Sequence, residues 1–144
     1  MTSPAKTFVD SNILIYAFDE SEAQKRLIAN LALSQLWSED SGALSVQVLQ
    51  EFYFNVTRKI RVPLVKSAAK KVLDHYGQWC GITTVREVQA ALRIEAEAKI
   101  SFWDGLIVAS AVQLGATRIL SEDLNHGQII EGIEIVNPFH NLEG

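Results

Sequence analysis

The sequence contains too little cysteine for several kinds of protein. Its single cysteine, Cys80, has no partner for an internal disulfide and cannot build a zinc site that needs several thiolates. Long hydrophobic runs are also lacking, because the longest, residues 13–18, is far shorter than the roughly 18 residues that a membrane-spanning helix needs. No such run stands near the N-terminus either, so we expect a soluble, cytoplasmic protein that does not bind membranes.

Positive charge is scarce as well. The chain has 13 Lys and Arg residues against 17 Asp and Glu residues, which gives a formal net charge of −4. Proteins that hold nucleic acid by their overall charge are strongly basic, so a nucleic-acid partner of this chain would be bound by a local group of residues. What the sequence does contain is 48% hydrophobic residues in a chain of 144, which is enough for one core. We therefore expect a single globular domain over residues 1–144.

Short apolar segments alternate along the chain with longer segments of helical periodicity. The helical segments are too long to be hairpin loops, so they predict an α/β fold in which strands pair in parallel and helices cover both faces of the sheet. The expected strands are residues 7–9, 43–45, 82–84, 117–120 and 133–136. The expected helices are residues 13–18, 22–37, 47–61, 64–78, 85–99 and 102–114.

Four separated carboxylates interrupt otherwise apolar segments: Asp10, Glu51, Asp104 and Asp123. Asp10 directly follows the first expected strand, and Asp123 lies three residues beyond the end of a later one. Ligands gather at the carboxyl ends of parallel strands, so both should lie at the same edge of the sheet. Like charges brought close together either take up protons or require a cation, so a cluster of these residues predicts a divalent metal ion. Because the segments contain neither Cys nor His, Mg²⁺ or Mn²⁺ is favoured over zinc.

Each of these carboxylates also has an ordinary structural explanation when it is taken alone. Asp10 can be a helix N-cap, and Asp104 can belong to a capping box with Ser101. Glu51 can be a solvated helix residue, and Asp123 can be a turn aspartate. These explanations remain open for the single residues, but they do not account for the placement of all four at one edge.

The segments that contain the carboxylates form a series of motifs. They are Phe8-Val9-Asp10-Ser11-Asn12-Ile13-Leu14-Ile15-Tyr16, then Leu49-Gln50-Glu51-Phe52, then Ser101-Phe102-Trp103-Asp104 followed by Leu106–Ala111, and finally Leu120-Ser121-Glu122-Asp123-Leu124. In this order and spacing they resemble the PIN-domain ribonucleases, and most closely the VapC toxins of prokaryotic toxin–antitoxin pairs. The resemblance extends from about Phe8 to Phe139, which is almost the whole chain.

The resemblance implies a three-layer α/β/α sandwich around a central parallel sheet. It also implies a metal-dependent endoribonuclease that hydrolyses RNA phosphodiesters with a metal-activated water. Ser11 and Asn12 match the polar pair that follows the first aspartate of the family. Ser121 matches the hydroxyl residue that the family has two positions before its last aspartate, so these three residues are candidates to orient the carboxylates. The expected partners are RNA, a cognate antitoxin and a second copy of the chain in a homodimer. The residues that match the acidic quartet of the family, and that would hold Mg²⁺ or Mn²⁺, are Asp10, Glu51, Asp104 and Asp123.

Two neighbours of the motifs need separate interpretation. Glu122 is acidic and adjacent to Asp123, but the pattern favours Asp123 as the ligand, and we expect Glu122 to face solvent. Gly105 stands where the family commonly has alanine, and we expect it to loosen the start of its helix slightly.

A basic segment follows the expected helix that carries Glu51. Six basic residues and no acidic ones stand between Arg58 and Lys71. They predict either an ordinary solvated helix face or a wall that guides RNA phosphates to the metal. Asn55 and Arg58 also share the helix face of Glu51, since they follow it by four and seven residues. The candidate RNA-binding residues are Asn55, Arg58, Lys66, Lys70 and Lys71.

Two other functions are compatible with parts of the pattern. A catalytically silent PIN-like domain could serve as a binding module, although the complete quartet argues against it. A phosphoacceptor signalling domain also combines a doubly wound sheet with acidic residues around a metal. That domain needs an aspartate at the end of a central strand and a lysine after a later strand. Here Leu44-Ser45 and Thr83-Thr84 offer no such aspartate, and no lysine follows Leu120.

Overall fold

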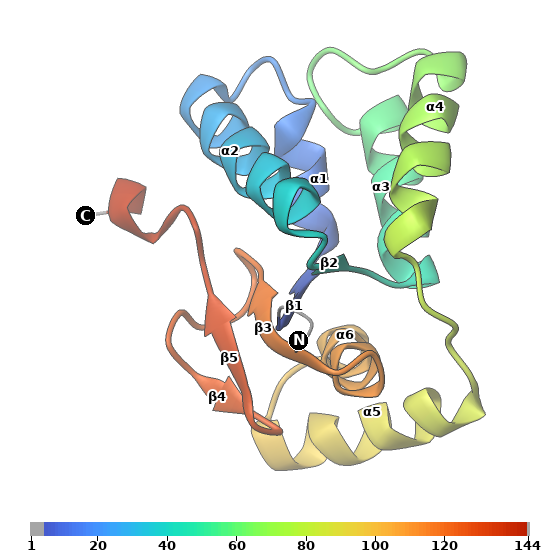
Figure 1. The fold of residues 1–144 in the computed structure, drawn as a ribbon, viewed down its shortest axis with the longest axis vertical. Helices are drawn as coiled ribbons and strands as arrows, with labels where there is room; N and C mark the ends of the chain where they lie inside the picture. The colour runs from blue at the N-terminus through green and yellow to red at the C-terminus, as the bar shows by residue number, and fades with distance from the viewer. Residues whose placement is uncertain (1–4, 144) are drawn as a thin grey trace.

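The computed structural model describes residues 5–143 as a sheet with helices on both sides. The strands are β1 Lys6–Val9, β2 Gly42–Ala43, β3 Ala116–Leu120, β4 Ile129–Ile130 and β5 Ile133–Val136. The helices are α1 Ser11–Ala17, α2 Ala23–Glu39, α3 Val46–Arg58, α4 Lys66–Tyr76, α5 Val85–Ala98 and α6 Phe102–Gln113, with short 3-10 helices η1 Gly77–Trp79 and η2 His140–Glu143. The strand order is β2-β1-β3-β5-β4, and Figure 1 shows the strands between α1–α4 above and α5 and α6 below. The α/β sandwich that the sequence predicts is confirmed.

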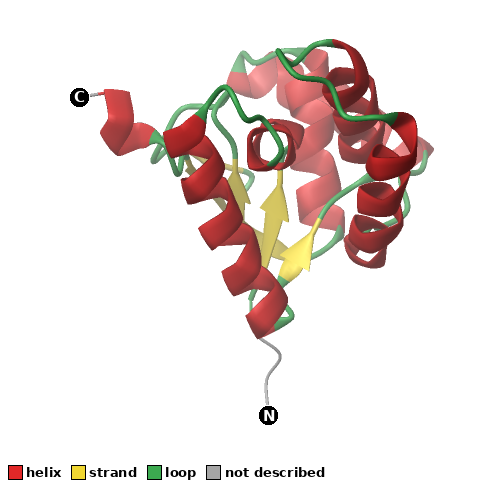
Figure 2. Cartoon of the chain, turned by 90° about the horizontal axis from the view of Figure 1, so that it is seen from above, coloured by secondary structure: helices red, strands yellow, loops and turns green. Residues whose placement is uncertain are grey.

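Parallel pairing accounts for most of the sheet. β1 lies between β2 and β3 and is parallel to both, and β3 pairs in parallel with β5. Figure 2, which views the molecule from above, shows the strands enclosed between helices. β4 differs, because it pairs antiparallel with β5. The sheet is therefore mixed at one edge, where the sequence predicts no strand.

The hairpin of β4 and β5 is missed because β4 is too short to show a hydrophobic pattern. Its two-residue turn, Glu131-Gly132, has positive φ at both positions, 51° and 78°. These angles belong to a type I′ turn, whose twist suits the right-handed twist of the two strands. Gly132, which adopts positive φ without strain, is the one sequence signal for this turn.

The strand that the sequence predicts at residues 82–84 does not form. The segment has no regular secondary structure, and Ile82 is 76% exposed. The backbone instead makes one isolated parallel bridge just before it, between Leu44 and Cys80. Its β-branched residues favour a strand, but that preference is weak where no packed neighbour buries the side chains. Thr84 serves as the N-cap of α5 instead.

The buried helix that the sequence predicts is α6. Its residues Gly105–Ala111 are all buried, and it packs against α5 and β3. Although α6 is strongly apolar, no helix among residues 5–143 has both the length and the apolarity that crossing a bilayer requires. Gly105 lies so close to α5 that a Cβ there would be 2.8 Å from the carbonyl oxygen of Ala91. This glycine therefore permits the close approach of two helices, a packing role that its place after Asp104 does not reveal.

We expect Gly105→Ala to lower the free energy of unfolding by about 1–3 kcal/mol, because a helix backbone must move to admit the methyl group. Gly77→Ala is the matched control, since Gly77 has helical backbone angles and a Cβ there would meet no atom within 4 Å. The control change should be neutral or stabilise by about 0.4–1 kcal/mol. Urea denaturation measures both effects, and equal stability of the two variants would contradict the close approach.

The carboxyl ends of β1, β3 and β5 meet at one edge of the sheet. Val9 pairs with Leu120, and Leu120 pairs with Val136. The N–H of Asp10 then donates to the carbonyl oxygen of Leu120 at 3.0 Å, so Asp10 and Ser121 leave the sheet side by side. Ligands of open α/β sheets bind at this edge.

Candidate active site

Asp10 is the buried member of the acidic cluster. Its Oδ1 accepts a hydrogen bond from the N–H of Ser11 at 2.7 Å, and its Oδ2 accepts one from the hydroxyl of Ser121 at 2.8 Å. Burial raises the pKa of Asp10 from 3.8 to about 7 in spite of these hydrogen bonds, which lower it, and the charges of Asp123 and Glu51 raise it further. The helix-cap explanation is therefore correct but incomplete, because an N-cap does not require a carboxylate that is only 3% exposed.

Asn12 and Ser121 connect Asp10 to Asp123. The Asn12 Nδ2 donates to Asp10 Oδ2 at 3.4 Å and to Asp123 Oδ2 at 3.2 Å. The Ser121 hydroxyl donates to Asp10 and accepts from the N–H of Asp123 at 3.1 Å. The residues that follow β1 and β3 are thereby joined through Asn12 and Ser121, two of the three residues for which the sequence predicts an orienting role.

Glu51 reaches the same cluster from α3, where it is half-buried. Burial raises its pKa most, and the charges of Asp104 and Asp123 raise it as well. The side chains of Ser11 and Gln47 lower the pKa of Glu51. Glu51 is therefore only partly solvated, and the charges of two other carboxylates act on it.

Asp104 approaches from the first turn of α6. The hydroxyl of the N-cap residue Ser101 accepts from the N–H of Asp104 at 3.0 Å, so the capping contact foreseen for this pair is present. Burial raises the pKa of the Asp104 carboxyl, and the charge of Asp123 is the next largest cause. The four carboxylates thus form one electrostatically coupled group.

This group has the chemistry of a site for a hard cation. Every ion pair found among residues 5–143 lies outside this group, so none of the four carboxylates is paired with a basic side chain. The same part of the chain contains no group of three or more Asp, Glu, His or Cys side chains close enough together to hold one ion. Mg²⁺ keeps several water ligands in proteins and needs only one or two carboxylates in direct contact. An ion held by these carboxylates would therefore be bound partly through water.

A groove of about 440 Å³ opens beside Asp123. Asn12 and Asp123 line it together with Asn55, which also donates to a backbone oxygen of α3. Lys59 and Arg61, which follow α3, line the same groove. Both belong to the basic segment but were not among the candidates selected from the sequence. The sequence signal that could have identified Lys59 and Arg61 is their position directly after the helix that carries Glu51.

The other candidate RNA-binding residues do not line this groove. The guanidinium carbon of Arg58 lies 4.9 Å from the ring centroid of Phe54, over its face. Lys66, Lys70 and Lys71 are exposed on α4, and Lys70 forms an ion pair within that helix. The structure therefore brings Asn55 to the acidic cluster and leaves the four basic candidates outside the groove.

The expectation that Glu122 faces solvent is wrong. Its side chain is 20% exposed, and its Oε2 lies 2.6 Å from Nζ of Lys25. Its Oε1 accepts from the hydroxyl of Tyr16 at 2.7 Å. These partners precede Glu122 by 97 and 106 residues, so the local sequence around it carries no sign of them.

The fold and the site agree with a known family. Residues 7–130 match the sequence model of the PIN domain, which is more than half of the chain. The chain therefore belongs to the PIN-domain family, and the resemblance predicted from its motifs is confirmed. This match excludes the phosphoacceptor signalling domain. No curated protein sequence matches the chain significantly.

Several solved structures share the fold. VapBC2 from Rickettsia felis, bound to a DNA fragment from its promoter, is 18% identical with a TM-score of 0.63 over 91% of this chain and 97% of that chain. FitAB bound to the IR36 DNA fragment is 18% identical with a TM-score of 0.70 over 93% and 96%. VapC20 from Mycobacterium tuberculosis, named as a toxin that cleaves the sarcin–ricin loop, is 16% identical with a TM-score of 0.56 over 82% and 90%. At identities this low, the structural similarity establishes a common fold and nothing further.

Proposed function

We propose that the protein is a metal-dependent endoribonuclease and the toxin of a toxin–antitoxin pair, with the chain as one nuclease domain. The observation that carries the proposal is the connection of buried Asp10 to Asp123 through Asn12 and Ser121, at the edge where carboxylates of α3 and α6 also arrive. A structural role gives no reason to place Asp10, Glu51 and Asp104 where burial and neighbouring carboxylates raise their pKa values, whereas binding a cation does. Membership of the PIN-domain family supports the same activity.

The acidic residues have distinct roles in this proposal. Mg²⁺ or Mn²⁺ would act as a Lewis acid that polarises a phosphodiester and lowers the pKa of the attacking water. Asp10, Asp104 and Asp123 would hold the ion, directly or through water. Glu51 completes the site or orients the attacking water from α3. The chain supplies no side-chain nucleophile in this mechanism, so its contribution is charge and position.

Three polar residues keep the carboxylates in place. The backbone N–H of Ser11 donates to Asp10 Oδ1 at 2.7 Å, and the Ser11 hydroxyl lowers the pKa of Glu51. Asn12 and Ser121 hold Asp10 from two other directions, at 3.4 Å and 2.8 Å from its Oδ2. Residues that orient metal ligands in this way commonly change metal affinity or activity by roughly 10–100-fold when they are replaced.

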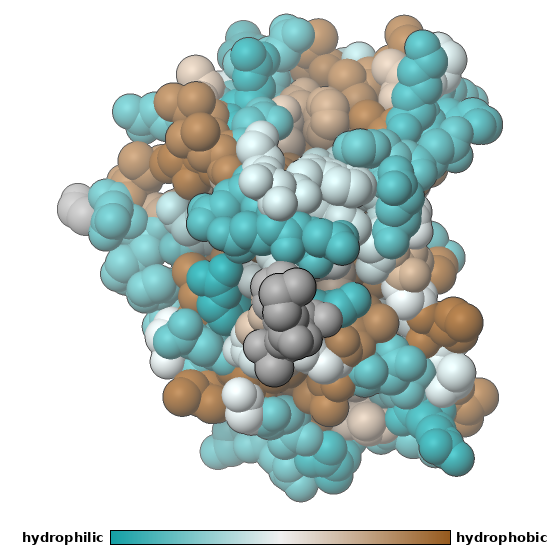
Figure 3. All heavy atoms as spheres, viewed as in Figure 1, coloured by the Kyte–Doolittle hydropathy of each residue, from teal (hydrophilic) through white to brown (hydrophobic). Residues whose placement is uncertain are grey.

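The similar structures support RNA as the substrate and an antitoxin as the partner. VapC20 is named as a cleaving toxin, and a Klebsiella pneumoniae structure with a TM-score of 0.64 is a toxin–antitoxin complex. A protein partner, whether the antitoxin or a second copy of the chain, would find apolar surface on this molecule. Figure 3 shows hydrophobic residues at the surface between hydrophilic ones. The exposed large hydrophobic residues include Leu27 and Leu31 on α2 and Val85 and Leu92 on α5.

An RNA cleavage assay with the purified chain tests the proposal. We expect a labelled single-stranded RNA to be cut in the presence of Mn²⁺ or Mg²⁺ and to stay intact with Asp104→Asn under the same conditions. The variant controls for contaminating nucleases, and circular dichroism checks that it is folded. If the folded wild-type chain cuts no RNA with either metal, a catalytically silent binding module becomes the better account.

Lys59 and Arg61 are the basic residues of the groove, and we expect them to contact RNA phosphates. Changing both to Gln should weaken binding to RNA of any sequence. Each phosphate neutralised on a single strand contributes about 0.7 to the slope of log affinity against log salt concentration, so the slope should fall by about 1.4. Fluorescence anisotropy at several salt concentrations measures this slope, with Asp104→Asn in the background to prevent cleavage.

Lys66→Gln with Lys70→Gln is the matched pair, because it removes the same charge from α4. The α4 lysines remain a prediction from the sequence, and they would extend the RNA path beyond the groove. We expect their replacement to reduce the slope less than the groove pair does. An unchanged slope in the groove pair would remove the groove from the RNA path.

A further inference from the structure

Three side chains beside the acidic site form a hydrogen-bonded group, here called the Lys25 cluster: Tyr16 on α1, Lys25 on α2 and Glu122 after β3. Lys25 Nζ is 2.6 Å from Glu122 Oε2 and 3.3 Å from the Tyr16 hydroxyl oxygen. The Tyr16 hydroxyl donates to Glu122 Oε1 at 2.7 Å. Both carboxylate oxygens of Glu122 are therefore held by helices from the N-terminal part of the chain.

Lys25 is fixed by more than its ion pair. Its Nζ lies 4.7 Å from the ring centroid of Tyr16 and 5.6 Å from that of Phe139, distances at which a cation is attracted to an aromatic face. The two rings also meet edge to face. The Lys25 and Glu122 side chains are only 23% and 20% exposed, unlike those of an ordinary surface ion pair, which are mobile and solvated. The Lys25 cluster therefore holds Glu122 in one position.

The backbone of Glu122 continues this chain of contacts into the acidic site. Its N–H donates to Asn12 Oδ1 at 3.1 Å, while Nδ2 of the same Asn12 donates to Asp10 and Asp123. The acceptor oxygen and the donor nitrogen of an asparagine amide point in different directions from the same carbon. Because the oxygen is bound to a backbone donor, the nitrogen must face the carboxylates. The main chain of Glu122 thus sets the orientation of Asn12.

We propose that Lys25 and Tyr16 are positioning residues of the acidic site: they anchor Glu122, whose backbone N–H orients Asn12 so that its amide nitrogen holds Asp10 and Asp123 together. The inference rests on the proposed function, because it concerns the same site. It also separates Glu122 from the metal ligands, since both of its carboxylate oxygens are engaged by the Lys25 cluster.

Two substitutions at one position test the proposal. Lys25→Met removes the charge but keeps a long side chain, and Lys25→Arg keeps the charge. The measurements are the NMR signals of the Asn12 side-chain amide in the metal-free protein, the affinity for Mn²⁺ by calorimetry without RNA, and kcat and KM for RNA cleavage. If Lys25→Met does not fold, Tyr16→Phe, which removes a single hydroxyl from the same cluster, replaces it.

In Lys25→Met we expect the Asn12 amide signals to shift and the Mn²⁺ affinity to fall roughly 10–100-fold. The kcat should fall while KM changes less than about twofold, because an interaction that supports chemistry is weakened and RNA contacts are not. Lys25→Arg should restore most of each property.

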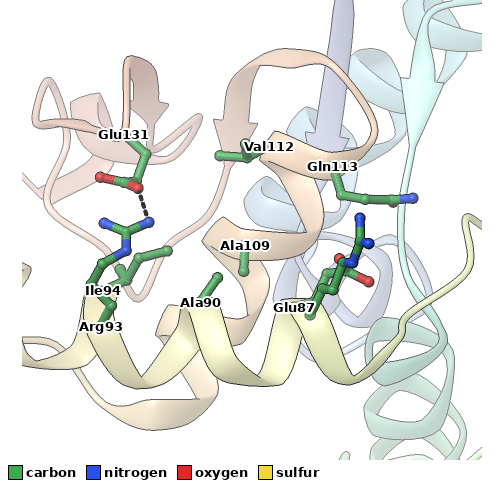
Figure 4. A pocket seen from close by; sticks show the side chains of 9 residues that line it. Glu87, Ala90, Arg93, Ile94, Ala109, Val112, Gln113 and Glu131 are labelled. Atoms are coloured by element: carbon green, nitrogen blue, oxygen red, sulfur yellow. Dashed lines mark hydrogen bonds and ion pairs between the residues drawn. The ribbon is translucent and has the colours of Figure 1, made fainter.

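Arg93→Met is the matched control for loss of an ion pair. Arg93 on α5 pairs with Glu97 and Glu131, and Figure 4 shows its guanidinium directed at Glu131. Its side chain is half exposed and belongs to neither the acidic site nor the groove. All three measurements should stay at wild-type values in this variant.

Unchanged Asn12 signals and unchanged Mn²⁺ affinity in folded Lys25→Met would overturn the proposal and leave a cluster that only stabilises the fold. A raised KM with unchanged kcat would also overturn it, because Lys25 would then contact RNA. If the wild-type chain neither binds Mn²⁺ nor cleaves RNA, the proposed function fails. The Asn12 signals still decide in that case whether the Lys25 cluster orients this residue.

Discussion

Asp10→Asn is expected to reduce RNA cleavage below detection and, at the same time, to stabilise the metal-free protein at alkaline pH. The loss of activity would follow from the removal of a charge that holds the metal ion in the proposed mechanism. The gain in stability follows from burial, which raises the pKa of Asp10 from 3.8 to about 7. A raised folded-state pKa means that ionising the carboxyl costs stability. The cost is absent below about pH 4, grows as the pH rises to about 7 and is complete above it.

The size of this effect is measurable by urea denaturation in EDTA. The full cost of ionising Asp10 corresponds to about 4 kcal/mol of unfolding free energy. Between pH 5 and pH 8, the wild-type protein should lose about 2–3 kcal/mol more than Asp10→Asn does. Asp40→Asn is the control, because Asp40 is exposed, lies outside the acidic cluster and has a left-handed backbone that asparagine also adopts. RNA cleavage by Asp10→Asn at the wild-type rate would contradict this assignment. The same pH dependence of the unfolding free energy in the wild-type protein, Asp10→Asn and Asp40→Asn would also contradict it.

Millimolar Mg²⁺ or Mn²⁺ is expected to raise the melting temperature substantially. An ion that binds only the folded protein stabilises it by mass action, by about 2.7 kcal/mol at a concentration of one hundred times Kd. For a domain of this size that corresponds to an increase of roughly 5–10 °C. The increase should be larger at pH 8 than at pH 5, because the carboxylates must be ionised to bind the ion. Differential scanning fluorimetry measures it.

Chelation and substitution provide the controls for this result. EDTA should return the melting temperature to the metal-free value and stop RNA cleavage. Asp104→Asn should lose most of the metal-dependent increase, whereas Asp40→Asn should keep it. Cleavage that continues after thorough chelation would contradict the metal mechanism, and an equal increase in Asp104→Asn would place the ion elsewhere.

The sequence predicts those parts of the fold and site that depend on order along the chain. Asp10 and Asp123 follow strands whose carboxyl ends must meet in a parallel sheet, so their proximity follows from the α/β pattern. α6 is recognisable because its apolar residues leave no polar face. The motif around Glu51 places it on the helix after β2, although its coupling to Asp104 is visible only in the structure.

The missing parts depend on contacts between distant residues or on very short elements. Glu122 looks like a solvent-facing neighbour until Lys25 and Tyr16 are placed against it. The role of Gly105 depends on how closely α5 approaches, which periodicity does not report. The β4 hairpin has only two residues in its first strand, and residues 82–84 have strand propensity without a strand to pair with.

The most direct test of the account is the position of a bound ion in crystals soaked with Mn²⁺, located by anomalous scattering. The account predicts one strong peak between Asp10, Asp104 and Asp123, in contact with these carboxylates or with water molecules that they hold. The Asp10→Asn crystal should lose this peak. A strong peak bound elsewhere on the molecule, with none at the acidic cluster of an enzyme that cuts RNA with Mn²⁺, would contradict it.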